Sequence, residues 1–255
     1  MKDFFIELIN RNEPLFWFGL CNLLAALVCI VLTQVDSTHV LGINAWIKPL
    51  KFFLSTLIFT WSIAWYMGYL QQSTAVSIYS WMLIIVFAFE NACIVYQASQ
   101  GQLSHFNIST SFNALLFSLM GVAITIFTLW TGYIGYLFFI NNFPELPTAY
   151  VWGIRLGILF FVIFAFEGGV MAANLAHTVG SPDGGSGLPL TNWSTQYGDL
   201  RIAHFIGMHA LQILPLLSFY FIKDTKIVVF IAIVYFLLTS YLFIQALSGK
   251  PFIKF

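Results

Sequence analysis

Two glutamates lie within otherwise apolar stretches of the sequence. Glu90 follows Phe87-Ala88-Phe89 and Glu167 follows Phe164-Ala165-Phe166, so one short motif occurs twice. An ionised carboxylate at the middle of a membrane helix costs about 2.5 to 3.5 kcal/mol, and a single lysine, Lys51, cannot neutralise two of them. The repeated motif therefore favours proton transfer, metal binding or catalysis over a structural ion pair.

Nitrogen ligands that can join these carboxylates are supplied by His105, His204 and His209. Two carboxylates and three imidazoles suit Fe, Zn or Mn. His204 and His209 are five residues apart, about 140° around an ideal helix, so they bind one ion only if the helix is distorted near Gly207. The sequence predicts a Glu/His metal site, with a haem held by His105 and His204 as the alternative. Capping of helix ends is the non-catalytic role open to these two histidines.

Further polar residues are predicted to support this site. Lys51 lies one helical turn deeper than Lys48 and is predicted to reach the glutamates, whereas Lys48 extends to the headgroups. Arg201 is predicted to offset carboxylate charge, or to hold an anionic substrate or a haem propionate. Amide side chains are predicted to orient the ligands, and those expected to do so are Gln97, Asn113, Asn174 and Gln212.

The elements that position these residues are indicated by the composition. Of the 255 residues, 60% are hydrophobic and 8% are charged, and no soluble domain of this size covers such a surface with polar groups. Ten Lys and Arg balance ten Asp and Glu, so the chain lacks the basic excess that nucleic-acid binding requires. The expected partner is the lipid bilayer, and the expected fold is an all-α polytopic membrane protein.

Charge-free runs define the expected transmembrane helices, because about 20 apolar residues cross a bilayer core of about 30 Å. The polar residues 71–74 separate the second helix from the third, and Gly132 and Gly135, together with Asn141-Asn142-Phe143-Pro144, mark the fraying and the end of the fourth. The chain is expected to form one integral membrane domain, 1–255, and its seven spans are predicted at about 15–35, 46–70, 77–97, 105–131, 151–174, 201–222 and 227–247.

Lysine and arginine are divided equally between the two sides of such a bundle. When Lys48, Lys51 and Arg201 are set aside as site residues, the remaining charges place the N-terminus in the cytoplasm and the C-terminus outside it. The first apolar run is followed by no small-residue cleavage site, so we expect no cleaved signal peptide. The expected location is a bacterial inner membrane, with the site open to the extracytoplasmic leaflet.

The internal sequence repeat extends beyond the two glutamates. An amide, Gln97 or Asn174, follows each glutamate by seven residues, and the His-Phe pairs that begin at His105 and His204 are each followed by an amide eight residues on. The third and fourth spans are thus predicted to repeat as the fifth and sixth, in parallel, with the glutamates facing each other across a pseudo-twofold axis. The Gly/Ser/Pro-rich segment 178–200 is expected to be a flexible outer loop, either a lid or a plain connector.

Parts of this residue set resemble those of known membrane families. A loose similarity to alkaline ceramidases and adiponectin receptors is carried by Ser104, Asp199, His204 and His209. The paired histidines of that group are four rather than five residues apart, and the resemblance implies a zinc-dependent lipid hydrolase. His105 and His204 are similar to a haem-binding histidine pair of cytochromes b, without the second pair of that family. A retinal protein is excluded because the last predicted span contains no lysine.

Three classes of function fit these observations. The predicted function is a metal-dependent redox enzyme, with Glu90, Glu167 and Lys51 as its catalytic residues. Its substrate would be lipid-soluble, such as a quinone or an acyl chain, and would enter laterally between helices. The first alternative is a proton-coupled transporter or channel that uses the two glutamates as proton-carrying groups. The second is a structural subunit of a larger membrane complex.

Overall fold

A computed structural model of the chain describes residues 2–70 and 73–253. The chain divides into two compact units, Met1–Trp130 and Thr131–Phe255, and the division falls within a long helix. Each unit has hydrophobic core clusters of its own.

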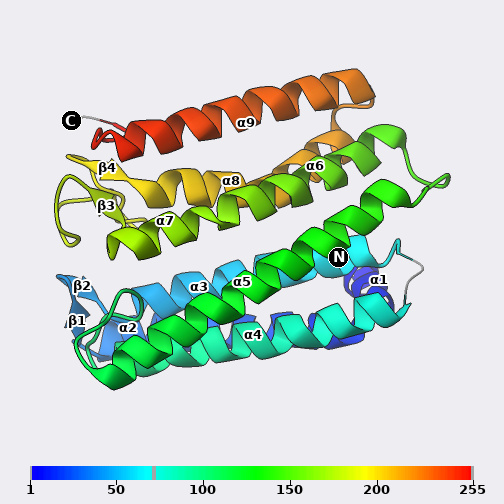
Figure 1. The fold of residues 1–255 in the computed structure, drawn as a ribbon. Helices are drawn as coiled ribbons and strands as arrows, with labels where there is room; N and C mark the ends of the chain where they lie inside the picture. The colour runs from blue at the N-terminus through cyan, green and yellow to red at the C-terminus, as the bar shows by residue number, and fades with distance from the viewer. Residues whose placement is uncertain (1, 71–72, 254–255) are drawn as a thin grey trace. The chain divides into compact units, whose positions relative to one another are not determined.

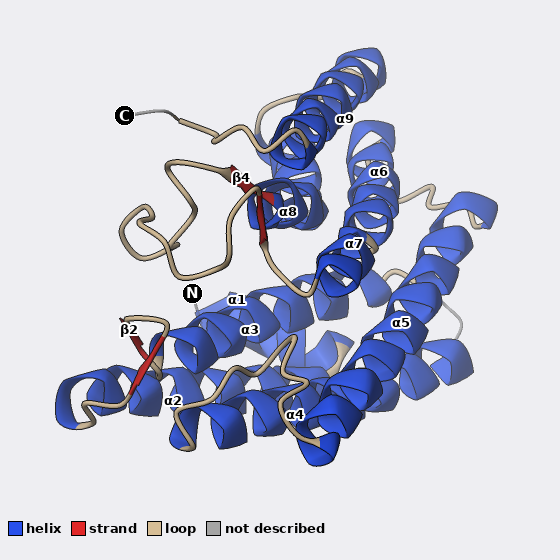
Figure 2. Ribbon diagram, turned by 60° about the vertical axis from the view of Figure 1, so that its left-hand side comes forward, coloured by secondary structure: helices blue, strands red, loops and turns tan. Residues whose placement is uncertain are grey.

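Helices make up most of both units (Figure 1). The first unit contains α1 (Lys2–Arg11), α2 (Glu13–Val35), β1 (His39–Val40), β2 (Ile43–Asn44), α3 (Ile47–Met67), α4 (Ser73–Ser99) and the first part of α5 (Ser111–Ile140). The second unit contains the rest of α5, α6 (Thr148–Ala165), α7 (Glu167–Asn174), β3 (Thr178–Val179), β4 (Gly198–Asp199), α8 (Leu200–Tyr220) and α9 (Thr225–Leu247). Strands β1 and β2 form a short antiparallel hairpin, and β3 pairs antiparallel with β4 at the two ends of a long connection (Figure 2).

Seven helices in the described ranges are long and apolar enough to cross a membrane, which confirms the predicted all-α polytopic fold. They are Glu13–Val35, Ile47–Met67, Thr74–Ser99, Ser111–Ile140, Thr148–Asn174, Leu200–Tyr220 and Thr225–Leu247. Most bounds agree with the sequence within a few residues. Gln71 and Gln72, which belong to the predicted break between the second and third spans, lie outside the described residues.

The fourth span, α5, begins and ends later than the predicted 105–131. Its start is fixed by Thr110, whose hydroxyl accepts a hydrogen bond from the Asn113 N–H at 3.1 Å, as in a helix N-cap. Phe106 has a φ of +60°, a left-handed conformation that interrupts a right-handed helix. His105 therefore lies in a loop and not at the start of the helix, as hydropathy alone had suggested.

The glycines of α5 do not mark its end, which corrects the predicted fraying. A Cβ atom at Gly135 would lie 2.8 Å from Cγ2 of Ile158, so this glycine lets α5 approach α6 closely. The helix ends at Asn141, one of the residues predicted to mark its end, and the backbone N–H and side-chain amide of Asn141 both donate to the carbonyl oxygen of Leu137. Gly132 lies within the helix as well.

The fifth span is interrupted by a turn at Phe166, between α6 and α7. The Gly169 N–H donates to the carbonyl oxygen of Phe166, three residues back, at 3.0 Å. Gly168 and Gly169 follow Glu167 directly, and glycine lowers the local preference for a continuous helix. The turn therefore places Glu167 at the first position of a separate short helix.

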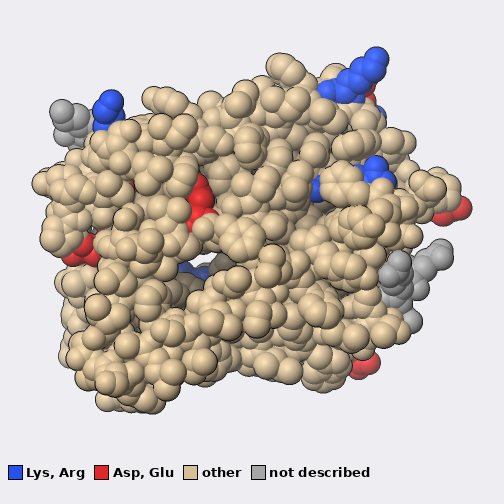
Figure 3. Space-filling model, viewed as in Figure 1, with Lys and Arg blue, Asp and Glu red and all other residues tan. Residues whose placement is uncertain are grey.

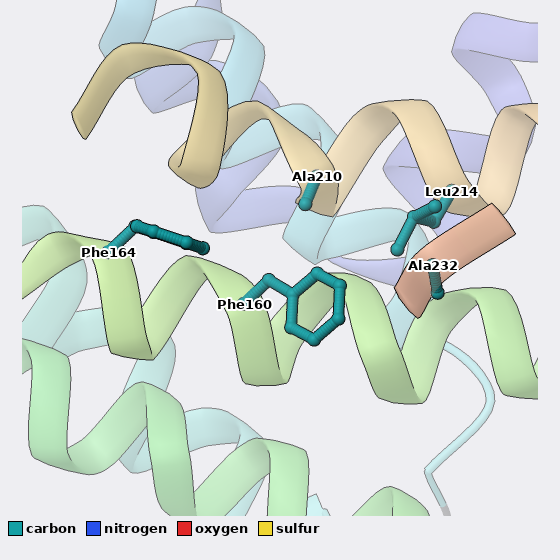
Figure 4. Packing of buried hydrophobic residues seen from close by; sticks show 5 residues of the cluster. All are labelled: Phe160, Phe164, Ala210, Leu214 and Ala232. Atoms are coloured by element: carbon teal, nitrogen blue, oxygen red, sulfur yellow. The ribbon is translucent and has the colours of Figure 1, made fainter. Parts of the chain in front are cut away.

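In the second unit, α6 packs closely against α8 because two glycines four residues apart lie between them. A Cβ at Gly153 would lie 2.2 Å from Oγ of Ser218, and one at Gly157 would lie 2.9 Å from the carbonyl oxygen of Ala210. Such pairs of small residues are typical of tightly packed membrane helices. Helix α9 adds to the same core (Figure 4), whose buried members are Phe160, Phe164, Ala210, Leu214 and Ala232.

In the first unit, α2 packs against α3 through Gly19 and Trp61. A Cβ at Gly19 would lie 2.1 Å from the Trp61 indole nitrogen, which donates to the carbonyl oxygen of Phe16 at 3.2 Å. The N-terminal helix α1 is held to α3 by Arg11, whose guanidinium lies 4.3 Å from the ring centroids of Trp65 and Tyr69. This contact fixes a short helix at the end of the unit.

The outer surfaces of the helices suit lipid. On the face in Figure 3, charged side chains lie mainly near helix ends, and other residue types cover most of the area between them. Large apolar side chains are exposed along the spans, as on α9, which exposes Phe230, Leu237, Leu238, Tyr241 and Ile244. The chain is therefore an integral membrane protein whose helices contact the bilayer.

Candidate functional site

Glu167 is the most deeply buried acidic side chain of the spans in the second unit. It is 6% exposed, and neither of its carboxylate oxygens has a hydrogen-bond partner among the described residues. A buried polar group without a partner is costly, so it needs a role or a ligand to explain it. Its position at the break between α6 and α7 makes it the centre of the candidate site.

His204 reaches the same break from α8. Its Nδ1 lies 2.8 Å from the carbonyl oxygen of Phe164, in the last turn of α6. A carbonyl oxygen only accepts hydrogen bonds, so Nδ1 carries the proton and Nε2 is the basic nitrogen of the neutral ring. A Cβ at Gly168 would lie 3.7 Å from Cε1 of His204, so the imidazole lies beside the residue that follows Glu167.

Close approach of the two helices makes this hydrogen bond possible. A Cβ at Gly207 would lie 2.1 Å from Cγ of Phe164, so the ring of Phe164 occupies the space that any larger residue would need. The glycine predicted as a point of distortion is therefore a packing contact within a regular helix. It brings the Phe164 carbonyl within reach of His204.

His209 has different partners from His204, as their five-residue spacing predicts for an undistorted helix. Its Nδ1 lies 3.2 Å from Oε1 of Gln212, and its ring centroid lies 4.3 Å from that of Phe205. Gln212 thus contacts a histidine, and its role in orienting metal ligands remains a prediction. Asn174, at the end of α7, is exposed.

Arg201 is engaged by the acidic residue that caps its own helix. Its guanidinium forms a two-pronged ion pair with Asp199, with Nε 2.9 Å from Oδ1 and Nη2 2.5 Å from Oδ2. Asp199 is 1% exposed and also accepts the backbone N–H groups of Ser194 and Arg201. The carboxylate whose charge Arg201 offsets is thus Asp199. The same pair anchors β4 to the start of α8.

An imidazole and a carboxylate, His177 and Asp183, form a pair at the base of the connection 178–200. Nδ1 of His177 lies 2.6 Å from Oδ2 of Asp183, and Asp183 also accepts the backbone N–H groups of His177 and Thr178. Burial disfavours the charged carboxylate, but these hydrogen bonds and the charge of His177 outweigh it and hold the pKa of Asp183 well below its usual range. This pair and the antiparallel pairing of β3 with β4 hold together the base of the predicted flexible loop.

In the first unit, Glu90 occupies the middle of α4. It is 5% exposed, and its Oε1 has no hydrogen-bond partner among the residues that the structure describes. Lys51, on α3, has an exposed side chain within this unit. The predicted pairing of Lys51 with the glutamates, and the predicted approach of Glu90 to Glu167, remain predictions.

The other polar residues predicted in the first unit lie toward the far end of α4. Nε2 of Gln97 donates to Oδ1 of Asn113 at 2.8 Å, and Nδ2 of Asn113 donates to Oε1 of Gln102 at 3.0 Å. His105 lies in the adjoining loop, with its Nδ1 3.0 Å from Oγ of Ser104. Gln97 and Asn113 thus orient each other, and none of these hydrogen bonds extends to Glu90.

Three buried polar residues of the first unit were missed by sequence reasoning. Nδ2 of Asn91 lies 3.0 Å from Oδ1 of Asn22 and 3.3 Å from Oγ1 of Thr56, which links α4, α2 and α3. The available signal was the occurrence of two asparagines within apolar runs. Neither asparagine belongs to the internal repeat, which supplied the four amides that were predicted to orient ligands.

The predicted metal ligands are divided between the two units. Glu90 and His105 belong to the first, and Glu167, His204 and His209 belong to the second. Within the described parts of the chain, no group of three or more His, Cys, Asp or Glu residues is arranged to hold a metal ion. The Fe, Zn or Mn site and the haem therefore remain predictions.

Comparison of the chain with protein-family models, with curated proteins and with solved structures finds no match.

Proposed function

We propose that the chain is a proton-coupled membrane transporter or channel in which Glu167 and Glu90 are the proton-carrying groups. The observation that carries this proposal is the burial of Glu167 with both carboxylate oxygens unpartnered in the described part of the chain. Ionisable groups inside a membrane are rare and costly, and proton relays are one of their few established uses. Glu90 on α4 is buried to a similar degree, and its Oε1 has no hydrogen-bond partner among the described residues.

The imidazole of His204, which lies beside Gly168, is the proposed proton acceptor for Glu167. The hydrogen bond from Nδ1 of His204 to the Phe164 carbonyl fixes the imidazole ring and leaves Nε2 to accept a proton. A proton that leaves Glu167 can thus be taken up by His204, with or without a bridging water. The break between α6 and α7 fits this role, because discontinuous membrane helices often form the ion sites of transporters.

Proton flux in proteoliposomes tests this function. The purified chain would be reconstituted with a pH-sensitive dye inside, and a membrane potential would be imposed with K⁺ and valinomycin. We expect inward proton flux above that of empty liposomes, reduced at least about tenfold in Glu167→Gln and strongly reduced in His204→Ala. Asn174→Ala is the matched control, because Asn174 lies on the same short helix with an exposed side chain. Flux that is unchanged in both site variants would remove the proposal.

A metal-dependent or haem-dependent redox enzyme is the second candidate, and a specific observation favours it. A histidine whose Nδ1–H donates to a carbonyl group, as His204 does, has the orientation that metal-binding histidines usually show. In this candidate Lys51 assists the catalytic glutamates and a quinone-like substrate enters from the bilayer. Metal analysis and an optical spectrum of the purified protein test it. Stoichiometric Fe, Zn, Mn or haem that is lost in His204→Ala supports this candidate, and its absence from the wild-type protein counts against it.

The proposed orientation places the N-terminus in the cytoplasm and the C-terminus outside a bacterial inner membrane. It is supported by the balance of Lys and Arg once the residues near the candidate sites are set aside. Under this orientation the base of the connection 178–200, with His177 and Asp183, lies on the extracytoplasmic side.

A further inference from the structure

A second polar site lies wholly within the first unit, between α2, α3 and α4. Its members are more than nine-tenths buried: Asn22 is 3% exposed, Thr56 2%, Thr60 0% and Asn91 5%. The hydrogen bonds from Asn91 to Asn22 and to Thr56 bring the three helices together at this point. Thr60 lies one helical turn from Thr56 on the same face of α3, about 6 Å along the axis.

The hydrogen bonds of this cluster leave two of its buried oxygen atoms without a partner. The two protons on Nδ2 of Asn91 serve Asn22 and Thr56, and Nδ2 of Asn22 donates one proton to the carbonyl oxygen of Phe18 at 2.8 Å. By contrast, Oδ1 of Asn91 and Oγ1 of Thr60 have no hydrogen-bond partner among the described residues. Oδ1 of Asn91 and the lone pairs of the Thr60 hydroxyl are thus available to a ligand.

Uncompensated oxygens of this kind indicate a bound positive charge or a hydrogen-bond donor. Small hard cations bind amide and hydroxyl oxygens, and several transporters bind Na⁺ with such neutral ligands within their spans. We propose that Asn22, Thr56, Thr60 and Asn91 form a binding site for a small monovalent cation, Na⁺.

This inference goes beyond proton transfer and does not depend on it, because it rests on residues other than Glu167 and His204. The competing explanation is a buried water, which also satisfies orphaned polar groups. A water donates to the oxygens and makes stability insensitive to the kind of cation in solution. A Na⁺ site makes stability depend on Na⁺ concentration.

Thermal unfolding of the detergent-solubilised full chain tests the site. Melting temperatures would be measured in NaCl, LiCl, KCl and choline chloride at constant ionic strength. We expect Na⁺ to raise the melting temperature by about 5 °C over choline at saturation. Thr60→Val should weaken the response to Na⁺ by at least about tenfold in concentration. Thr128→Val is the matched control, since Thr128 is 3% exposed but its hydroxyl donates to the carbonyl oxygen of Ile124.

Two results would overturn the proposal. Equal melting temperatures in sodium and choline would indicate water only, and a sodium response in Thr60→Val equal to that of the wild type would place the ion elsewhere. If Thr60→Val does not fold, equilibrium binding of radioactive ²²Na⁺ to the wild-type protein decides. About one ion per chain, displaced by unlabelled Na⁺ but not by choline, supports the site, and no saturable binding contradicts it.

Discussion

At the residue scale, the second unit has an unpartnered buried carboxylate, Glu167, and an oriented imidazole, His204, which lies beside Gly168. Glu167 has no hydrogen-bond partner among the described residues, whereas His204 is fixed through Nδ1 by a backbone carbonyl. The first group can hold a proton in an apolar environment and the second can accept one. This combination is the reason for ranking proton transfer above metal chemistry.

The contact between Gly207 and Phe164 should be sensitive to a single added methyl group. A Cβ at Gly207 would lie 2.1 Å from the Phe164 ring, so Gly207→Ala should destabilise the protein by about 1 to 3 kcal/mol through overpacking. Gly121→Ala, on α5, is the control because nothing lies within 4 Å of its added Cβ. Thermal or denaturant unfolding in detergent measures both. Equal stability of the two variants would contradict the close approach of α6 and α8.

The His177–Asp183 pair should give the protein an acid-sensitive component of stability. The pKa of Asp183 lies below its ordinary value in the folded protein. The stabilisation is therefore complete above the unfolded pKa of about 3.9 and is lost as the pH falls through the folded pKa. Asp183→Asn should lower the melting temperature at neutral pH and reduce the difference between neutral pH and pH about 3. Asp224→Asn serves as the control for removing one carboxylate, and an identical pH profile in wild type and Asp183→Asn would refute the pairing.

The sequence reveals charged residues within spans but not the backbone groups that meet them. Glu90 and Glu167 stand out because each is an isolated charge in an apolar run. The hydrogen bond of His204 to the Phe164 carbonyl has no such signal, since it depends on the close approach that Gly207 allows. The oxygen-rich cluster around Asn91 lies between these cases, because its amides are visible in the sequence but their convergence is not.

At the element scale, hydropathy predicts which segments are helices, and local hydrogen bonding decides where they begin. The start of α5 was misplaced because Thr110 caps the helix and the loop before it contains a left-handed Phe106. The break at Phe166 was missed because α6 and α7 read as one continuous apolar run. The break places Glu167 at the first position of α7, where the proposed function assigns it a proton-carrying role.

The attachment of α1 depends on one arginine. Arg11 lies against the rings of Trp65 and Tyr69, and its Nη1 donates to the Trp65 carbonyl oxygen at 3.0 Å. Arg11→Lys should cost about 1 kcal/mol, because lysine lacks the planar group that makes both ring contacts and the hydrogen bonds. Glu7→Gln, which removes only the partly exposed ion pair, should cost less. Denaturant unfolding followed by tryptophan fluorescence measures both variants, and an equal loss would assign the attachment to the ion pair.

At the scale of the whole molecule, the proposed orientation places the two termini on opposite sides of the membrane, in keeping with the seven candidate spans of the described ranges. We expect a fluorescent-protein fusion at the N-terminus to be bright and an alkaline phosphatase fusion at the C-terminus to be active in a bacterial host. The reason is the excess of Lys and Arg on the inner side after Lys48, Lys51 and Arg201 are set aside. An active phosphatase fused to the N-terminus would reverse the orientation.

The most direct test of the central claim is labelling of the membrane protein with an apolar carbodiimide, which enters apolar protein interiors and reacts with protonated carboxyl groups. Peptide mass spectrometry would locate the adducts after reaction at several pH values. We predict adducts at Glu167 and Glu90 that decrease as the pH rises, because both are buried within spans and are proposed to carry protons. Labelling that is confined to surface carboxylates, with neither glutamate modified at any pH, would contradict the account.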